Sequence, residues 1–425
     1  MQIKLTAAEK KQLWIFLAVA FGMPIVMGIL MGISFYRGND VSVFPNAQMY
    51  YPAAGVMLAY ILTRKKEEKL PMKFYVSFII LTGIMTVTAI ISMILPEIPF
   101  VMIIQYIIII GSLLLWIPFL MDKKEVRRNY GLSLGDGQKR RPWLYVLLFL
   151  VLYFLRIFLS YVIAGQPGEF LKLFQNSYVW INMMALPINF FLVFTAFFGE
   201  EYGWRGFLQP MLQKRFGKRA GVLLLGIMWG FWHLPINMFY YSPDTWLQSV
   251  VSQLLTCTGL AIFFGYAQMK TRNIWVPVIM HYLNNNLIAV VAGSADVISG
   301  QVIAWGDVLI LLVLIAVLFA PFIFSKAYGK EAPQEQKITE EYTELSFGNK
   351  GGIRVKNKRM KIARIEKDFS QEQLAEAVGV TRQTIGMIEA GKFNPSLQLC
   401  IGICRALGKT LDELFWEEED DEENR

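Results

Sequence analysis

Long runs of apolar residues dominate the first three quarters of the chain. A helix needs about 20 such residues to cross the hydrocarbon core of a bilayer. Ten runs approach or reach this length, at residues 13–34, 47–63, 74–95, 100–121, 143–164, 178–199, 220–240, 247–267, 274–293 and 302–325. The second run is short, and the sixth and seventh have ambiguous inner ends. The pattern therefore predicts an all-α fold, a polytopic helical membrane bundle of eight to ten spans.

The pattern changes after residue 325, the expected end of a membrane domain over residues 1–325. Residues 326–352 are polar and contain Pro and Gly, which predicts a flexible linker. Residues 353–416 place apolar residues at helical spacing, which predicts a small soluble domain of five helices. Residues 417–425, EEEDDEENR, form an acidic tail.

The composition supports a membrane protein. Hydrophobic residues make up 55% of the chain and charged residues 17%, whereas about a quarter of a soluble globular protein is charged. This excludes a wholly soluble or disordered chain. Three cysteines are too few for a disulfide framework. There are only two histidines, His233 and His281, so any histidine chemistry must use these two.

Lysine and arginine are distributed unevenly between the loops. If the N-terminus is cytoplasmic, the inner loops hold 21 of these residues, while the outer loops hold only Arg37 and Lys172. The positive-inside rule then predicts a multi-pass protein of the cell membrane, of a bacterial type, with both termini in the cytoplasm. The basic residues 1–12 and the run after them superficially resemble a signal peptide. The run is too long and lacks a small-residue cleavage site, so a retained anchor is expected.

Polar or ionisable residues interrupt the apolar runs at four places. Such residues are costly in a membrane and are functional candidates by default. They are Glu200, Glu201 and Arg205 in FFGEEYGWRG, His233 in MWGFWHLP, His281, Asn284 and Asn285 in MHYLNNN, and Arg156 in YFLRIFL. Each place taken alone also has a structural interpretation, such as an ion pair one turn apart, a packing histidine or an interhelical amide.

Taken together, two glutamates, two histidines and an asparagine from three helices can line one polar cavity. This set suits a hydrolase. A carboxylate can act as general base on water, and imidazole can bind a metal or share in proton transfer. An amide can donate to a developing oxyanion. His281 and Asn285 are one helical turn apart and share a face.

These residues resemble the motifs of the CPBP family, the intramembrane endopeptidases of the CAAX-prenyl-protease and bacteriocin-processing type. The family's motifs match in order: EExxxR at Glu200, Glu201 and Arg205, FxxxH at His233 with Trp229 in place of Phe, and HxxxN at His281 and Asn285. The similar region covers about residues 140–295. The tryptophan departs mildly from the pattern and affects the expected pocket shape.

The resemblance implies hydrolysis of a peptide bond in a peptide or protein substrate at the membrane. It assigns water activation to Glu200 with help from His233, and oxyanion stabilisation to His281 and Asn285. Glu201 would orient Arg205 or support the site. The family is described both as metalloproteases and as metal-free enzymes, so a Zn²⁺ ion held by Glu200, His233 and His281 is an open alternative. The HExxH helix is absent.

The C-terminal domain resembles the Cro/phage-repressor (XRE-type) helix-turn-helix domain. The segments SQEQLA, VTRQTI and GKFNPS occur in the family's order. Ser370 and Gln373 are expected to form a capping box, and Thr381 to cap the next helix. The resemblance implies that helix 381–390 enters the major groove of double-stranded DNA, and that the domain can form a homodimer.

The expected DNA contacts follow from this resemblance. Base edges would be read from the leading turn of the recognition helix, and phosphates would be met by residues beside it. The predicted DNA-binding residues are Gln371, Thr381, Arg382, Gln383, Thr384 and Lys392, of which Gln371 and Lys392 are assigned to phosphates. Residues 353–416 carry a net charge of +4 and the tail one of −6, so the tail weakens non-specific attraction to DNA. Cys400 and Cys404 are expected in the domain core.

Two other functions remain open at this point. The chain could be a catalytically silent, membrane-anchored transcriptional regulator or scaffold of the same fold, or a transporter with a polar cavity. The transporter is disfavoured because the polar residues match hydrolase motifs and no repeated halves are found. Glu200→Gln separates the first two functions, since it should abolish a peptidase phenotype and spare a scaffold phenotype.

Overall fold

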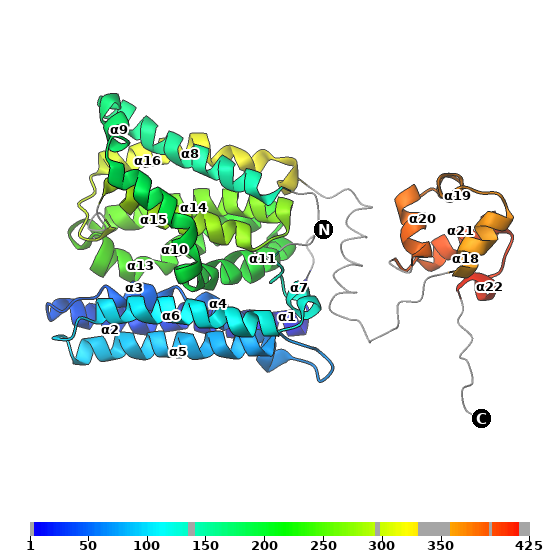
Figure 1. Ribbon diagram of the computed structural model, residues 1–425, viewed down its shortest axis with the longest axis horizontal. Coiled ribbons are helices and arrows are strands. Elements are labelled where there is room, and N and C mark those ends of the chain that lie inside the picture. Colours follow the sequence, from blue (N-terminus) through cyan, green and yellow to red (C-terminus); the bar gives the residue numbers. More distant parts are fainter. Residues whose placement is uncertain (1–3, 135–140, 294–297, 330–357, 391–392, 416–425) are drawn as a thin grey trace. The chain divides into compact units, whose positions relative to one another are not determined.

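The computed structural model describes residues 4–134, 141–293, 298–329, 358–390 and 393–415. The chain divides into two compact units, Met1–Lys337, here called the membrane unit, and Ile338–Arg425, the C-terminal unit. Every regular element of the described residues is helical, which confirms the predicted all-α fold (Figure 1).

The membrane unit is a bundle of long helices with short connecting elements. Its elements in chain order are α1 (Ala7–Leu17), η1 (Ala18–Gly22), α2 (Met23–Tyr36), α3 (Val43–Gln48), α4 (Tyr51–Thr63), α5 (Met72–Ile94), α6 (Phe100–Met121), α7 (Lys124–Asn129), α8 (Pro142–Ile163), α9 (Pro167–Leu173), α10 (Ser177–Glu201), η2 (Tyr202–Leu208), α11 (Gln209–Phe216), α12 (Lys218–Trp232), α13 (Leu234–Ile236), η3 (Asn237–Tyr241), η4 (Pro243–Thr245), α14 (Trp246–Thr271), α15 (Trp275–Ala292), α16 (Trp305–Leu318), η6 (Ala320–Phe324) and η7 (Lys326–Tyr328).

Seven helical stretches within the described residues are long and apolar enough to cross a membrane. They are Ala7–Tyr36, Met72–Ile94, Phe100–Met121, Pro142–Ile163, Ser177–Phe216, Pro243–Thr271 and Trp305–Phe324. A pair of helices bent by 42°, Lys218–Trp232 and Leu234–Tyr241, makes eight if it forms one broken span. The chain is therefore a multi-pass membrane protein, at the lower end of the expected eight to ten spans.

The two apolar runs that do not add a span are nevertheless helical. The run 47–63 contains α4, which has only 13 residues and is largely buried inside the bundle. The run 274–293 forms α15, which has 18 residues but carries His281 and three asparagines that lower its hydropathy. Both runs are helical, but α4 is too short and α15 too polar to count as a span, which explains the difference from ten spans.

Close packing positions the helix that carries the two glutamates. The stretch from α10 through η2 packs against α4. Gly199 and Gly203 lie at this contact, and a Cβ atom on either would overlap the Met49 carbonyl oxygen or Pro52. Glu200 and Glu201 lie between these two glycines. Glycine is therefore required here so that the stretch that carries Glu200 and Glu201 can approach α4.

We expect Gly203→Ala to destabilise the protein, because the added methyl group cannot fit against Pro52 without moving backbone. Overpacking of this kind costs about 1–3 kcal/mol. The thermal midpoint of the detergent-purified protein measures the effect. Gly83→Ala in α5 is the control: no atom lies within 4 Å of its Cβ position, so stability should stay equal or rise. Equal midpoints for the two variants would contradict the close contact.

The C-terminal unit has five described helices around its own core, as predicted. They are α18 (Lys358–Glu366), α19 (Gln371–Ala377), α20 (Arg382–Glu389), α21 (Leu397–Leu407) and α22 (Leu411–Phe415). The core consists of Met360, Ala363, Leu374, Ala375, Ile385, Ile388, Ile403, Cys404, Leu407 and Leu414. Ser370 and Gln373 form the expected capping box, and the Thr381 hydroxyl accepts from the Thr384 amide. Cys400 and Cys404 are buried, which raises the pKa of both thiols and agrees with a packing role.

The beginning of the expected linker is packed rather than free. Lys326–Tyr328 forms the short helix η7, and Tyr328 is only 3% exposed. Its hydroxyl donates to the Ile262 carbonyl at 2.6 Å. These residues therefore belong to the membrane unit. The remainder of the linker from residue 330, and the acidic tail 417–425, lie outside the described residues.

Candidate functional site

Trp229 in α12 lies where the three sequence motifs meet. Its indole nitrogen donates to Oε2 of Glu200 at 2.8 Å. Its ring also neighbours both histidines, with centroid distances of 6.0 Å to His233 and 5.4 Å to His281. A second indole, that of Trp204, donates to the same Glu200 oxygen at 3.3 Å. Residues from the long α10–α11 stretch, α12 and α15 thus form one cluster.

Glu201 has different partners from those of its neighbour Glu200. Its Oε1 accepts from Nη1 of Arg205 at 2.9 Å and from Nδ1 of His281 at 2.8 Å. The side chains of Glu201 and Arg205 are fully buried. The Arg205 guanidinium also lies over the Trp229 ring, 4.2 Å from its centroid. The ion pair expected from the four-residue spacing is therefore present, and it also orients His281.

His233 lies at the bend that follows α12. Its Nδ1 is 2.8 Å from the Trp229 carbonyl oxygen, and because a carbonyl can only accept, Nδ1 carries the proton. Nε2 is then the nitrogen with the lone pair. Asn237 donates to the His233 carbonyl at 2.9 Å, and Gln48 donates to the Trp232 carbonyl at 2.8 Å. Both side-chain amides therefore bind backbone carbonyl groups at this bend.

Asn285 lies one helical turn beyond His281 on α15, so the two share a face as expected. Its Oδ1 accepts from the Asn284 amide at 3.0 Å, and both asparagines are partly exposed. The described contacts unite Glu200, Glu201, Arg205, His233 and His281 around Trp229. Asn285 stands next to this cluster rather than inside its hydrogen-bond network.

The expected zinc ligands do not form a metal site in the described geometry. No group of three or more His, Cys, Asp and Glu side chains is placed to hold a metal ion within the part of the chain that the structure describes. Oε2 of Glu200 is occupied by two indole donors, and Nδ1 of His281 is used by Glu201.

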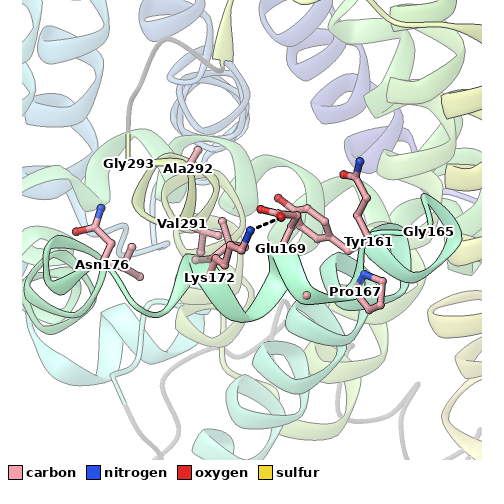
Figure 2. A pocket seen from close by; sticks show the side chains of 13 residues that line it. Tyr161, Gly165, Pro167, Glu169, Lys172, Asn176, Val291, Ala292 and Gly293 are labelled. Carbon is pink, nitrogen blue, oxygen red and sulfur yellow. Dashed lines mark hydrogen bonds and ion pairs between the residues drawn. The ribbon is translucent and has the colours of Figure 1, made fainter.

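A separate pocket of about 770 Å³ lies between α8, α9, α10 and the end of α15. Figure 2 shows its polar wall, where Lys172 pairs with Glu169 at 2.6 Å. Both side chains are about half exposed. The described lining contains none of the motif residues, so this pocket is distinct from the cluster around Trp229.

Helix α20, the predicted recognition helix, presents a polar leading turn. Arg382 and Gln383 are exposed, and Nη1 of Arg382 lies 3.9 Å from Oε2 of the equally exposed Glu372. Thr381 and Thr384 share a hydrogen bond between their hydroxyl groups at 2.9 Å. Arg382 and Gln383 are therefore available for contacts with bases, while the two threonines hold the start of the helix.

Gln371 is tied into a buried network. Its amide donates to Oε2 of Glu389 at 2.8 Å, and Glu389 pairs with Arg364 at 2.6 Å. This network joins α18, α19 and α20, so Gln371 fixes the recognition helix as well as being a candidate for phosphate contact. Lys392, the other predicted phosphate contact, lies outside the described residues.

Sequence reasoning missed several side chains that complete the cluster. Trp229 was expected only to affect the pocket shape and Trp204 was not singled out, yet both donate to Glu200. Gln48 could have been noticed as a polar residue within an apolar run. Its partner, the Trp232 carbonyl, lies 184 residues away and could not have been identified from the sequence. Asn237 lies four residues after His233, and that spacing could have indicated a contact one turn apart.

Comparison with known proteins points to two families. Residues 182–287 match the family described as Type II CAAX prenyl endopeptidase Rce1-like, and residues 360–414 match a helix-turn-helix family. CAAX prenyl protease 2 of Methanococcus maripaludis is 26% identical over 218 residues, which cover 49% of this chain and 76% of that protein. No solved structure matches the chain.

The relatives of the C-terminal unit are small regulators. The uncharacterized HTH-type transcriptional regulator YgzD of Bacillus subtilis is 47% identical over 66 residues, which cover 16% of this chain and 98% of that protein. An uncharacterized HTH-type transcriptional regulator of Methanothermobacter thermautotrophicus is 50% identical over 58 residues, which cover 13% of this chain and 84% of that protein.

Proposed function

Because residues 182–287 match the type II CAAX prenyl endopeptidase Rce1-like family and residues 360–414 match a helix-turn-helix family, we propose that the protein is an intramembrane endopeptidase with a tethered DNA-binding domain. Its substrate is a peptide or protein at the membrane. Water activated by Glu200 attacks the peptide bond. The C-terminal unit binds double-stranded DNA in a sequence-specific manner.

The observation that carries this proposal is the different surroundings of the two adjacent glutamates. Glu201 is neutralised by Arg205 and bonded to His281 through the same oxygen. Glu200 has no cation among its described hydrogen-bond partners, and both indole donors bind one oxygen, Oε2. Oε1 is then the oxygen of Glu200 that can accept a proton from water. A general base must lie within hydrogen-bond reach of its water, and in the proposed reaction Oε1 is the oxygen that makes this contact.

The histidines have complementary roles in the proposed reaction. His233, with its proton on Nδ1, has Nε2 available to help Glu200 handle the proton of the water. His281 donates from Nδ1 to Glu201, whose carboxylate stabilises positive charge on the ring. Nε2–H of His281 and the amide of Asn285 can then donate to the tetrahedral oxyanion.

Peptide cleavage by the detergent-purified protein tests this proposal. We expect the protein to cleave members of a peptide library, the Glu200→Gln variant to cleave none, and a chelator to leave cleavage intact. Metal analysis of the same sample accompanies the assay. Loss of cleavage on chelation, with recovery on adding Zn²⁺, would instead support the alternative in which Glu200, His233 and His281 hold zinc. A wild-type protein that cleaves nothing would favour the silent membrane-anchored regulator.

We place the protein in the cell membrane with both termini in the cytoplasm. The short basic elements α7 and α11 lie at one end of the bundle, and α9 lies at the other (Figure 1). Lys214 of α11 also pairs with Glu9 near the start of α1 at 2.9 Å, which brings the N-terminal helix to this basic end. A reporter fused after Ser325 that is active only outside the cell should stay silent, and a signal would overturn this orientation.

A further inference from the structure

A row of three buried polar side chains begins in the cluster around Trp229 and continues along the same helical stretch. Glu201, Arg205 and Gln209 are spaced four residues apart along the continuous helix from α10 to α11, so they share a face. Their exposed fractions are 0%, 1% and 2%. Four of their atoms have no hydrogen-bond partner among the described residues: Oε2 of Glu201, Nε and Nη2 of Arg205, and Oε1 of Gln209.

Polar atoms buried this deeply are nearly always bonded to protein or to ordered water. The four atoms comprise two donors and two acceptors. The Glu201–Arg205 pair is neutral overall, so a further ion of either sign would not be balanced. The ligand that matches such a set is a small neutral molecule that both donates and accepts hydrogen bonds, which is water.

Gly265 in α14 provides the room beside Gln209. A Cβ atom at this glycine would lie 2.9 Å from Oε1 and 3.0 Å from Nε2 of Gln209, and 2.8 Å from the hydroxyl oxygen of Tyr328. The Gln209 amide and the Tyr328 hydroxyl therefore both lie against the backbone of Gly265, in the space that a side chain would otherwise fill. Tyr328 also lies within electrostatic range of Arg205. The row of polar side chains thus runs from Glu201, which bonds the catalytic His281, to Tyr328.

Tyr328 closes the far end of this row. Its ring packs with Val222 and Ala261, and its hydroxyl donates to the Ile262 carbonyl. The residue lies in η7, the last described element before the segment that leads to the C-terminal unit. Gln209, five residues before Lys214, lies toward the basic end of the bundle. Tyr328 thus lies beside Gln209, the member of the row nearest that end.

We propose that Glu201, Arg205 and Gln209 bind a file of water molecules, and that this file supplies the hydrolytic site from the end of the bundle that Tyr328 closes. The binding of water is independent of the peptidase chemistry, whereas the supply role rests on the proposed function. Such a route suits an intramembrane hydrolase, because the hydrocarbon core around it holds almost no water.

Thiol labelling tests the water file without relying on activity. Gln209→Cys and a control, Thr195→Cys, are treated with a small water-soluble methanethiosulfonate reagent, and modification at each position is followed by mass spectrometry. Thr195 is also fully buried and polar, but its hydroxyl is bonded to Tyr50 and Ser112. We expect Gln209→Cys to react at least several-fold faster than Thr195→Cys. Equal rates would mean that the buried row is dry and would overturn the proposal.

Variants at Tyr328 test the closing role with the same readout. Tyr328→Ala removes the ring and should speed the labelling of Gln209→Cys, whereas Tyr328→Phe keeps the ring and should not. Neither change should alter labelling of Thr195→Cys. If Tyr328→Ala leaves the Gln209→Cys rate unchanged, the tyrosine does not close this route. Thermal midpoints of all variants confirm that each is folded before its rates are compared.

Peptide cleavage then tests the supply role. Gln209→Met keeps the side-chain length and removes the polar amide, so we expect a several-fold lower kcat with an unchanged KM. Fast labelling together with full activity of Gln209→Met would overturn the supply role and leave the water site standing. Absence of cleavage in the unaltered protein would count against the proposed peptidase function, while labelling would still decide the water site.

Discussion

Replacing Glu200 by glutamine is expected to abolish peptide cleavage and to leave the protein folded. The amide has the shape of the carboxylate, and its oxygen can still accept from Trp229 and Trp204. It cannot take a proton from water at neutral pH. General-base catalysis contributes about 10²–10⁴-fold to rates, so the loss in kcat should be of this order. Because no cation pairs with Glu200 among the described contacts, removing its charge breaks no ion pair.

Replacing Glu201 by glutamine should have a different signature. This change leaves the Arg205 guanidinium buried without its carboxylate, and breaking a buried ion pair costs about 3–5 kcal/mol. The thermal midpoint should therefore fall clearly, together with part of the activity, because His281 then faces a neutral amide oxygen instead of a carboxylate. For Glu200→Gln, by contrast, activity should fall much further and the midpoint little.

Kinetic constants and thermal midpoints of both variants, measured on the same preparations, separate these outcomes. Glu169→Gln serves as the control because its pair with Lys172 is about half exposed, and exposed pairs contribute little to stability. Equal losses of activity in the Glu200 and Glu201 variants, with equal midpoints, would show that the roles of the two glutamates are wrongly assigned even if the site is correct.

The local parts of the site could be predicted from the sequence. Glu201 and Arg205 are four residues apart on a helix, and the structure pairs them. The capping box at Ser370 and the cap at Thr381 also depend on neighbours within three residues, and both are present. In each case the interaction lies within one turn of a helix, where spacing alone determines which side chains can meet.

The contacts that the sequence did not predict join segments that lie far apart in the chain. Gln48 reaches the bend before His233 from α3, and Tyr328 reaches α14 from the expected linker. Periodicity assigns a residue to a face but does not say which helix covers that face. The upper count of ten spans is not reached for a related reason: α15 carries His281 and three asparagines, which lower the hydropathy by which a span is recognised.

The second large effect is expected at the recognition helix. Arg382 is exposed on the first turn of α20, and it has only a 3.9 Å contact with the exposed Glu372. Such a surface pair is worth little, so the guanidinium can leave it for a base edge. A bidentate contact with guanine contributes about 1–3 kcal/mol of discrimination. Arg382→Ala should therefore reduce the preference for a selected operator over random DNA by a corresponding factor.

Residues 353–425 expressed alone provide the material for this test. One regulator similar to this unit consists of little else, since 66 matched residues cover 98% of YgzD. The domain should select a sequence from a random duplex pool and bind it as a dimer or on paired half-sites. Arg405→Ala is the matched control, because it removes an equal charge from an exposed position on α21 outside the recognition helix. It should leave the preference unchanged.

Lys392 and the acidic tail should affect affinity without affecting sequence preference. A phosphate contact carries no base information, so Lys392→Ala should weaken operator and random DNA about equally. Removing residues 417–425 takes away a net charge of −6 and should strengthen non-specific binding at low salt, where repulsion between the tail and the phosphates is least screened. A domain that selects no sequence even at low salt would be a packing module, and the protein would then act as a membrane peptidase alone.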